Sequence, residues 1–241
     1  MRRMIETTHD PMGMAITDYW STGHASRLRV FSPMFDEDEI PVEHLFRTLE
    51  SMPPLERKAL DMVRGRVLDV GAGAGCHTLV LQERGVPVTA IDISPLSVAV
   101  MKQRGVRNVQ CIDFFELEGL YDTILMLMNG IGIVGKVDCL PAFFAHLDRV
   151  LAPGGQVLCD SSDISYVFEN DDGVVELPPG DAYYGELTYR MKYNNVRGRE
   201  FPWLFVDAVT LAREAAQKGY RVQLLAEGDN HDFLAKIEKK V

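Results

Sequence analysis

Short apolar runs alternate with longer amphipathic stretches from Arg66 to the end of the chain. Continuous apolar runs of this length are typical of parallel strands that are buried on both faces, and the stretches between them have the helical period. The sequence predicts strands at 66–70, 87–91, 108–112, 122–128 and 155–160. This alternation indicates an α/β fold, in which helices cover both faces of a parallel sheet.

The predicted helices carry recognisable start and stop signals. Ser94-Pro95 combines a capping hydroxyl with a proline in the first helical turn. An amphipathic helix is expected at 138–151. Three further helical segments are followed by a glycine that can take the left-handed terminal conformation: Gly85, Gly105 and Gly219.

Two segments do not follow this alternation. Residues 1–64 precede the first core strand, and helices are expected within them at 43–52 and 55–63. Residues 165–205 are predicted to hold an inserted β-hairpin. Its strands are expected at 185–193 and 199–204, with a turn at Asn194-Asn195, and the chain then resumes with a helix at 205–218 and strands at 221–226 and 232–237.

Length, composition and charge narrow the class of protein. The 241 residues suit one domain with its own core, and the formal net charge of −10 argues against a protein that grips a phosphate backbone. No apolar stretch is long enough for a signal peptide or a membrane span, so we expect a cytoplasmic protein that does not contact a membrane. The four cysteines form no C-x-x-C pair and three of them lie in apolar runs, so buried, reduced thiols are expected in preference to a redox or metal role.

A small basic cluster stands out against this acidic background. It consists of Arg190, Lys192, Arg197 and Arg199. The sequence allows two interpretations, a solvated side of the hairpin or a contact with a substrate or partner.

The stretch from Val67 to His77 is the main chemical signal. A buried strand ends at Val70, and Gly71, Gly73 and Gly75 then form a tight turn into a helix. Such a loop lets backbone N–H groups and a helix N-terminus approach a ligand closely. Asp92 ends the next strand, where an acid can accept hydrogen bonds from a ribose. The pattern predicts a site for a cofactor that contains a nucleoside.

The spacing of the glycines favours one cofactor over another. The dinucleotide pattern G-x-G-x-x-G fails, because Cys76 stands at its third glycine position. The spacing present is Asp-x-Gly-x-Gly-x-Gly, starting at Asp69, and here the chain resembles the class I S-adenosylmethionine-dependent methyltransferases. Further stretches match that family in order: residues 88–94, 108–114, 121–129 and 151–158.

The resemblance implies a Rossmann-like, doubly wound, mostly parallel seven-stranded sheet in a single methyltransferase domain. Its parts would be an N-terminal helical lid at 1–64, a cofactor-binding core at 65–164, the inserted hairpin at 165–205, and a C-terminal helix with closing strands at 206–241. The implied cofactor is S-adenosyl-L-methionine, and the implied state is a monomer or homodimer.

The resemblance also implies roles for individual residues. Gly71, Gly73 and Gly75 would let the backbone pass close to the methionine half of the cofactor, with Asp69 near its amino group. Asp92 would hold the ribose. Adenine would lie between Ile93 and Phe114 with its amino group on Asp113, and Asn129 would face the reacting sulfur.

Three other side chains are weaker candidates. His77 lies in the first turn after the glycine loop, where it would touch the carboxylate of the cofactor or simply pack. Tyr19 and Trp20 would form part of the lid over the methionine end, or would anchor a helix on the sheet.

The acceptor is predicted to be a small molecule. Enzymes that methylate exocyclic amines of bases carry Pro-Pro and an aromatic after the fourth strand, whereas this chain has Asn129-Gly-Ile-Gly132. No cluster has the spacing of metal ligands. His24, Tyr19 and His231 are weak candidates for a base. The alternatives are a module that binds the cofactor without turnover, a protein or nucleic-acid methyltransferase, and an NAD-dependent dehydrogenase.

Overall fold

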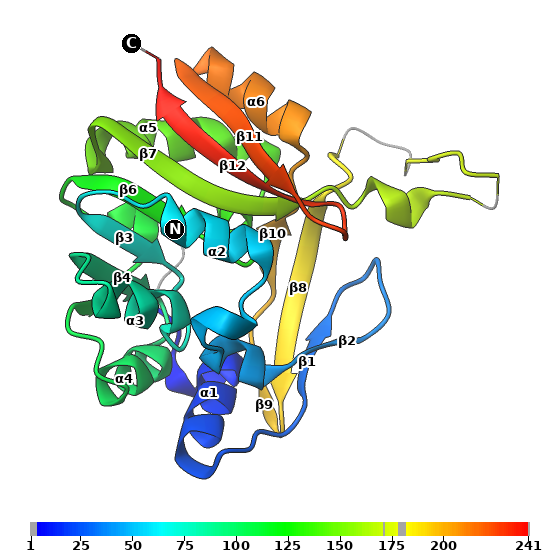
Figure 1. Cartoon of the computed structure of the whole chain (residues 1–241). Coiled ribbons are helices and arrows are strands. Elements are labelled where there is room, and N and C mark those ends of the chain that lie inside the picture. The colour runs from blue at the N-terminus through cyan, green and yellow to red at the C-terminus, as the bar shows by residue number, and fades with distance from the viewer. Residues whose placement is uncertain (1–3, 171, 178–181, 241) are drawn as a thin grey trace.

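The computed structural model describes residues 4–170, 172–177 and 182–240, and its main feature is a seven-stranded sheet in the order β11-β12-β7-β6-β3-β4-β5 (Figure 1). Neighbouring strands from β5 to β7 run parallel, and β12 is antiparallel to both β7 and β11. The strands are β3 (Val67–Val70), β4 (Val88–Asp92), β5 (Val109–Cys111), β6 (Tyr121–Met126), β7 (Leu151–Ser162), β11 (Tyr220–Glu227) and β12 (Asp232–Lys239). The predicted α/β fold is confirmed.

Helices cover both faces of this sheet, because successive side chains of each strand point to opposite sides. Leu68 and Val70 belong to the cluster that includes Phe143 of α5, whereas Val67 packs with Leu81 of α3. The helices are α1 (Pro11–Thr22), α2 (Pro54–Asp61), α3 (Cys76–Glu83), α4 (Pro95–Gln103), α5 (Leu140–Val150) and α6 (Ala208–Gln217).

The predicted helix ends are also confirmed. The Ser94 hydroxyl caps α4 by accepting a hydrogen bond from the Ser97 N–H at 3.0 Å. Gly85, Gly105 and Gly219 have φ of 75°, 91° and 77° and follow α3, α4 and α6. The expectation for the cysteines is wrong at Cys139, which is exposed at the end of a short 3-10 helix (Val137–Cys139). Cys76 and Cys159 are buried and Cys111 is half-buried.

A second sheet, which the sequence did not predict as a whole, contains the inserted hairpin. Its order is β10-β8-β1-β2, with β9 paired to β8. The hairpin strands are β8 (Glu186–Tyr193), β9 (Val196–Arg197) and β10 (Phe201–Leu204), and the N-terminal segment supplies β1 (Leu28–Phe31) and β2 (Asp38–Ile40). We refer to these five strands as the small sheet.

The N-terminal segment therefore differs from the predicted helical extension. Residues 43–52 form two 3-10 turns, Val42–Phe46 and Leu49–Ser51, instead of one helix. The break has a local cause: Thr48 is extended and forms a capping box with Ser51, which begins a new turn. The second expected helix is present as α2.

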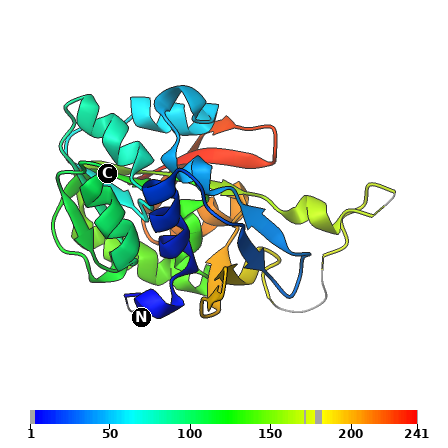
Figure 2. The same ribbon diagram turned by 90° about the horizontal axis from the view of Figure 1, so that it is seen from below.

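Helix α1 packs between α4 and β8, as Figure 2 shows from below. Its Ala15 contacts the cluster that contains Leu28 and Tyr193 of the small sheet. Its Ile16 belongs to a second cluster with Ala74 and Val100 of the core. Both side chains are fully buried. Helix α1 thus joins the small sheet to the main domain.

Because of this packing, Ile16→Ala should destabilise the protein by about 2–5 kcal/mol, the usual cost of such a cavity. Val209→Ala, which trims an apolar side chain that is 76% exposed on α6, should change the free energy of unfolding by less than about 0.5 kcal/mol. Chemical unfolding measures both. Equal changes in the free energy of unfolding would mean that the packing of α1 contributes little to the stability of the fold.

Candidate functional site

The glycine loop lies where the strand order reverses, since β3 pairs with β4 on one side and with β6 on the other. Ligands of open α/β sheets bind at such a switch point, beyond the carboxyl ends of the strands. Gly71 and Gly73 have φ of 69° and 57°, and a Cβ at either would meet no heavy atom within 4 Å. Both therefore leave the backbone open to a ligand. A Cβ at Gly75 would lie 3.1 Å from Met101 and Val106, so this third glycine serves the packing of the loop on α4.

Asp92 links this loop to the start of α4. Its Oδ2 accepts a hydrogen bond from the Gly73 N–H at 2.9 Å, and its Oδ1 accepts one from the Ser94 N–H at 2.8 Å. Each oxygen keeps a further lone pair. Burial raises the pKa of Asp92 to about 6, with smaller contributions from Asp10 and Asp69. The group is thus largely ionised at neutral pH and can accept further hydrogen bonds from hydroxyls.

Ser94 continues this chain of hydrogen bonds to the N-terminal segment. Its hydroxyl donates to Asp10 Oδ2, and Asp10 Oδ1 accepts from the Gly13 N–H at 2.8 Å, which caps α1. A Cβ at Gly13 would lie 2.2 Å from Asp10 Oδ2, so only glycine fits there. The Ile5 N–H also donates to the Ile93 carbonyl at 3.0 Å. The segment before α1 is therefore bonded to the turn that follows β4.

Sequence reasoning missed Asp10, although a signal was available. Asp10-Pro11 has the form of a helix start, with a capping carboxylate followed by a proline in the first turn. This signal predicts the cap of the helix but not the hydrogen bond from Ser94 to Asp10, because Ser94 is distant in sequence.

Asp69 and His77 are buried in structural contacts. The Thr78 hydroxyl donates to Asp69 Oδ2 at 2.5 Å, which ties the first turn of α3 to β3, and burial raises the pKa of Asp69. His77 Nε2 lies 2.8 Å from Glu56 Oε2, and Arg47 pairs with the same carboxylate. All three members of this ion cluster are less than a tenth exposed.

The surroundings of His77 favour its protonated form. Burial alone would lower the pKa of His77, but Cys76, the Glu56 carboxylate and Asp69 together raise it well above its ordinary value. Burial likewise opposes ionisation of Glu56, yet His77 and Arg47 outweigh it and lower the pKa of that carboxyl. This arrangement favours packing over a cofactor contact for His77. Arg47 and Glu56 carried no local sequence signal.

Two buried oxygens in this region have no hydrogen-bond partner within the described part of the chain. They are Asp113 Oδ2 and Asn129 Oδ1. Asp113 Oδ1 caps a short turn by accepting from the Phe115 N–H, and Asn129 Nδ2 donates to the Leu204 carbonyl at 3.3 Å. A buried acceptor without a donor costs about 1–3 kcal/mol. Both positions therefore suit a ligand that brings N–H or O–H donors.

The backbone at the end of β6 is unusual. Met128 and Asn129 both adopt left-handed conformations, with φ of 64° and 54°. Backbone strain of this kind in residues other than glycine clusters at functional sites. The Gly130 N–H donates to Asp160 Oδ1 at 3.3 Å, and burial raises the pKa of Asp160 to about 6. This turn thus gathers polar groups beside the glycine loop.

The two residues expected to cover adenine differ in exposure. Ile93 is half-buried, whereas Phe114 is 3% exposed and packs on Phe143 and His146. Phe114 is therefore a core residue in this structure. Its contact with an adenine ring stays a prediction.

Tyr19 and Trp20 are both on α1 but are placed differently. The Tyr19 ring lies 4.7 Å from the Phe46 ring, as an anchor would. Trp20 is 42% exposed. Their part in a lid stays a prediction. Of the weak base candidates, His24 is exposed, and so is His231, whose ring stacks on Tyr166.

The small sheet reaches the turn after β6 through β10. A Cβ at Gly132 would lie 2.2 Å from Trp203 Nε1, so the indole lies directly against this turn. Tyr183 and Tyr184 do not lie against this turn through their hydroxyls. They donate hydrogen bonds to Asp207 and Asp163, which hold the two rings in place.

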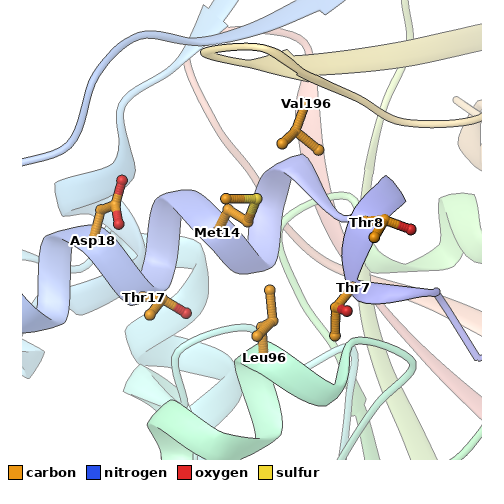
Figure 3. Close-up of a pocket in the computed structure, with 7 residues that line it drawn as sticks. All are labelled: Thr7, Thr8, Met14, Thr17, Asp18, Leu96 and Val196. Atoms are coloured by element: carbon orange, nitrogen blue, oxygen red, sulfur yellow. The ribbon is translucent and has the colours of Figure 1, made fainter.

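A pocket of about 460 Å³ lies between the N-terminal segment, α4 and β9 (Figure 3). Its apolar part comes from Met14, Leu96 and Val196, and the remaining lining is polar: Thr7, Thr8, Thr17 and Asp18. The N-terminal segment and the insertion thus form a concave surface together.

No helix in the described part of the chain is long and apolar enough to cross a membrane.

Comparison with known proteins identifies close relatives. The chain matches a family described as "Methyltransferase domain" over residues 42–225. A solved S-adenosylmethionine-dependent methyltransferase from Bacteroides fragilis, in complex with S-adenosyl-L-homocysteine, is 48% identical. It aligns over 99% of this chain and 98% of its own, with a TM-score of 0.93.

Curated relatives match over shorter segments. A malonyl-[acyl-carrier protein] O-methyltransferase of Serratia marcescens is 33% identical over 93 residues, which is 39% of this chain and 36% of that protein. A demethylmenaquinone methyltransferase of Tropheryma whipplei is 34% identical over 114 residues, which is 44% of this chain and 46% of that protein. The matched segments thus span less than half of these two relatives.

The open loop predicts a specific effect of substitution. Gly73→Ala should weaken binding of S-adenosylhomocysteine at least tenfold, because its methyl group would enter the space that a ligand approaches. Gly85→Ala is a matched control, since Gly85 also has a positive φ and no heavy atom within 4 Å of a Cβ. Both should lose about 1–2 kcal/mol of stability. Calorimetric titration measures affinity, and equal affinities would show that the loop is misassigned.

Proposed function

Because the chain belongs to the methyltransferase-domain family of class I S-adenosylmethionine-dependent enzymes, we propose that it transfers a methyl group from S-adenosylmethionine to a small-molecule acceptor. The observation that carries this proposal is the pairing of the open glycine loop with Asp92 at the switch point of the sheet. The 48% identical relative, which holds S-adenosylhomocysteine, supports the choice of cofactor.

The residues present fit this cofactor. Gly71 and Gly73 would contact its methionine half through the backbone, and ionised Asp92 would accept hydrogen bonds from its ribose hydroxyls. The unpartnered Asp113 Oδ2 would accept from the adenine amino group. When bound, the cofactor supplies a methyl group on a positively charged sulfur.

The chain contributes mainly alignment and exclusion of water to this displacement. The turn at Asn129 and the indole of Trp203 lie at the carboxyl end of β6, where they would orient the acceptor. An amine or thiolate acceptor needs hardly any base, whereas a hydroxyl needs one. Asp160, with a pKa of about 6 and a place beside this turn, is a better candidate for that role than the exposed His24 and His231.

A small acceptor is favoured over a macromolecule. The name of the Tropheryma whipplei relative gives demethylmenaquinone, a small molecule, as its acceptor. The Serratia marcescens relative is named for a malonyl group on an acyl-carrier protein, so it does not decide this point. The net charge of −10 disfavours nucleic acid. We propose that the acceptor binds between the N-terminal segment and the insertion, because these segments build the small sheet together and place Trp203 against the turn after β6.

Parallel titrations with S-adenosylmethionine, S-adenosylhomocysteine and NAD test the cofactor. We expect micromolar binding of the first two and none of NAD, and tight NAD binding would overturn the proposal. Turnover is tested by release of S-adenosylhomocysteine with a panel of hydroxyl, amine and thiol acceptors. Binding without release for any acceptor class would identify a module that holds the cofactor without catalysis.

The raised pKa of Asp92 predicts a pH dependence of binding. The ribose hydroxyls would bond to the ionised carboxylate, so the affinity is fully present only well above pH 6 and is lost as the pH falls through 6. S-adenosylhomocysteine should bind about tenfold more weakly at pH 5 than at pH 7.5. Asp92→Asn should remove this dependence. Asp160→Asn should keep it, although the Asp160 carboxyl also has a pKa of about 6 in the wild type. The reverse result would move the ribose contact away from Asp92.

A further inference from the structure

The outer face of the small sheet carries a pocket of about 200 Å³, lined by Arg29, Phe31, Arg190, Lys192 and Arg197. These side chains share one face because they alternate with residues that point the other way. Between them along β1 and β8 are Val30 and Met191, and the opposite face packs on α1 through Leu28 and Tyr193. The cations thus lie on the side that α1 does not cover.

The strand register places like charges directly opposite each other. Arg29 is the cross-strand neighbour of Lys192, and Lys192 is in turn the neighbour of Arg197. Like charges at directly opposite positions destabilise a sheet. Lys192 is half-buried between the two arginines, so this repulsion acts on β8, between β1 and β9. Packing alone gives no reason for three cations in this register.

Carboxylates neutralise only the rim of this pocket. Glu37 lies 3.3 Å from Arg29, and Glu200 lies 3.5 Å from Arg190, as exposed pairs that contribute little. Glu39, which is also opposite Arg29 in register, pairs with Arg27. Among the described residues, no carboxylate lies within 4 Å of the Lys192 ammonium or the Arg197 guanidinium, although the chain carries a net charge of −10.

The Phe31 ring contacts the guanidinium groups of Arg29 and Arg190. Its ring centroid lies 5.5 Å from the Arg29 guanidinium carbon and 5.9 Å from that of Arg190. Contacts at this distance are attractive and restrict where the cations lie. Two of the four cations of the pocket therefore lie against one aromatic ring.

We propose that this pocket binds a phosphate-class dianion, either free or as the terminal group of a phosphomonoester. Four cations match a doubly charged oxyanion with three or four acceptor oxygens better than a carboxylate with two. Arginine offers paired donors in the geometry that phosphate accepts, and lysine adds a point charge. The bound anion would offset the repulsion across β1, β8 and β9. This site goes beyond the proposed methyl transfer and does not depend on it.

The test is titration of the full chain with inorganic phosphate and with glycerol 3-phosphate at constant ionic strength. We expect saturable binding that weakens at least tenfold in the double variant Lys192→Gln with Arg197→Gln. The matched control is Arg213→Gln with Arg221→Gln, which removes the same charge from exposed positions on α6 and β11 and should bind like the wild type. Unsaturable binding, or equal loss in both double variants, would overturn the proposal.

The two ligands distinguish the source of the anion. Equal affinities would support recognition of the oxyanion alone, and tighter binding of the ester would support a phosphorylated molecule. Thermal unfolding without ligand gives a second measurement: the Lys192 and Arg197 double variant should melt at a higher temperature, because the repulsion is relieved. An unchanged or lower midpoint would contradict the repulsion on which the proposal rests. Binding of S-adenosylhomocysteine should be unchanged, which separates this site from the cofactor site.

Discussion

A chain of buried and partly buried hydrogen bonds from Gly73 through Asp92 and Ser94 to Asp10 joins the glycine loop to the N-terminal helix. Burial raises the pKa of both carboxyls, so each depends on the donors that this chain supplies. Loss of one partner would leave a buried acceptor unpaired. The loop, the start of α4 and the start of α1 are therefore connected, and the N-terminal segment belongs to the glycine-loop end of the molecule.

Helix α1 extends this connection to the small sheet. One side of α1 packs on Ala74 of the glycine loop and Val100 of α4, and another side packs on Leu28 and Tyr193. On the far edge of the small sheet, Trp203 lies against Gly132 in the turn after β6. The small sheet is thus held at two places, beside the nucleoside end and beside the reacting end of the proposed site. Its uncovered face remains available for a different ligand.

Much of the main sheet, the glycine loop and the place of Asp92 beside it could be predicted, because they rest on local signals. Strand and helix periods record which face of each element is buried, and Gly71 and Gly73 record a backbone conformation that other residues take only with strain. Asp92 could be placed beside the loop because the end of a parallel strand has a fixed relation to the loop after the neighbouring strand. Strand β6 ends at Met126, earlier than the expected residue 128, since Met128 and Asn129 leave the extended conformation.

The sequence by itself determined the class of fold, the glycine loop and the acid that faces it. Only the tertiary structure decided that β1 joins β8, that Asp10 bonds to Ser94, that His77 is held by Glu56 and Arg47, and that Phe114 packs in the core. The physical reason is the same in each case. These contacts join residues that are distant along the chain, and the register or cavity that brings them together leaves no periodic pattern in either partner.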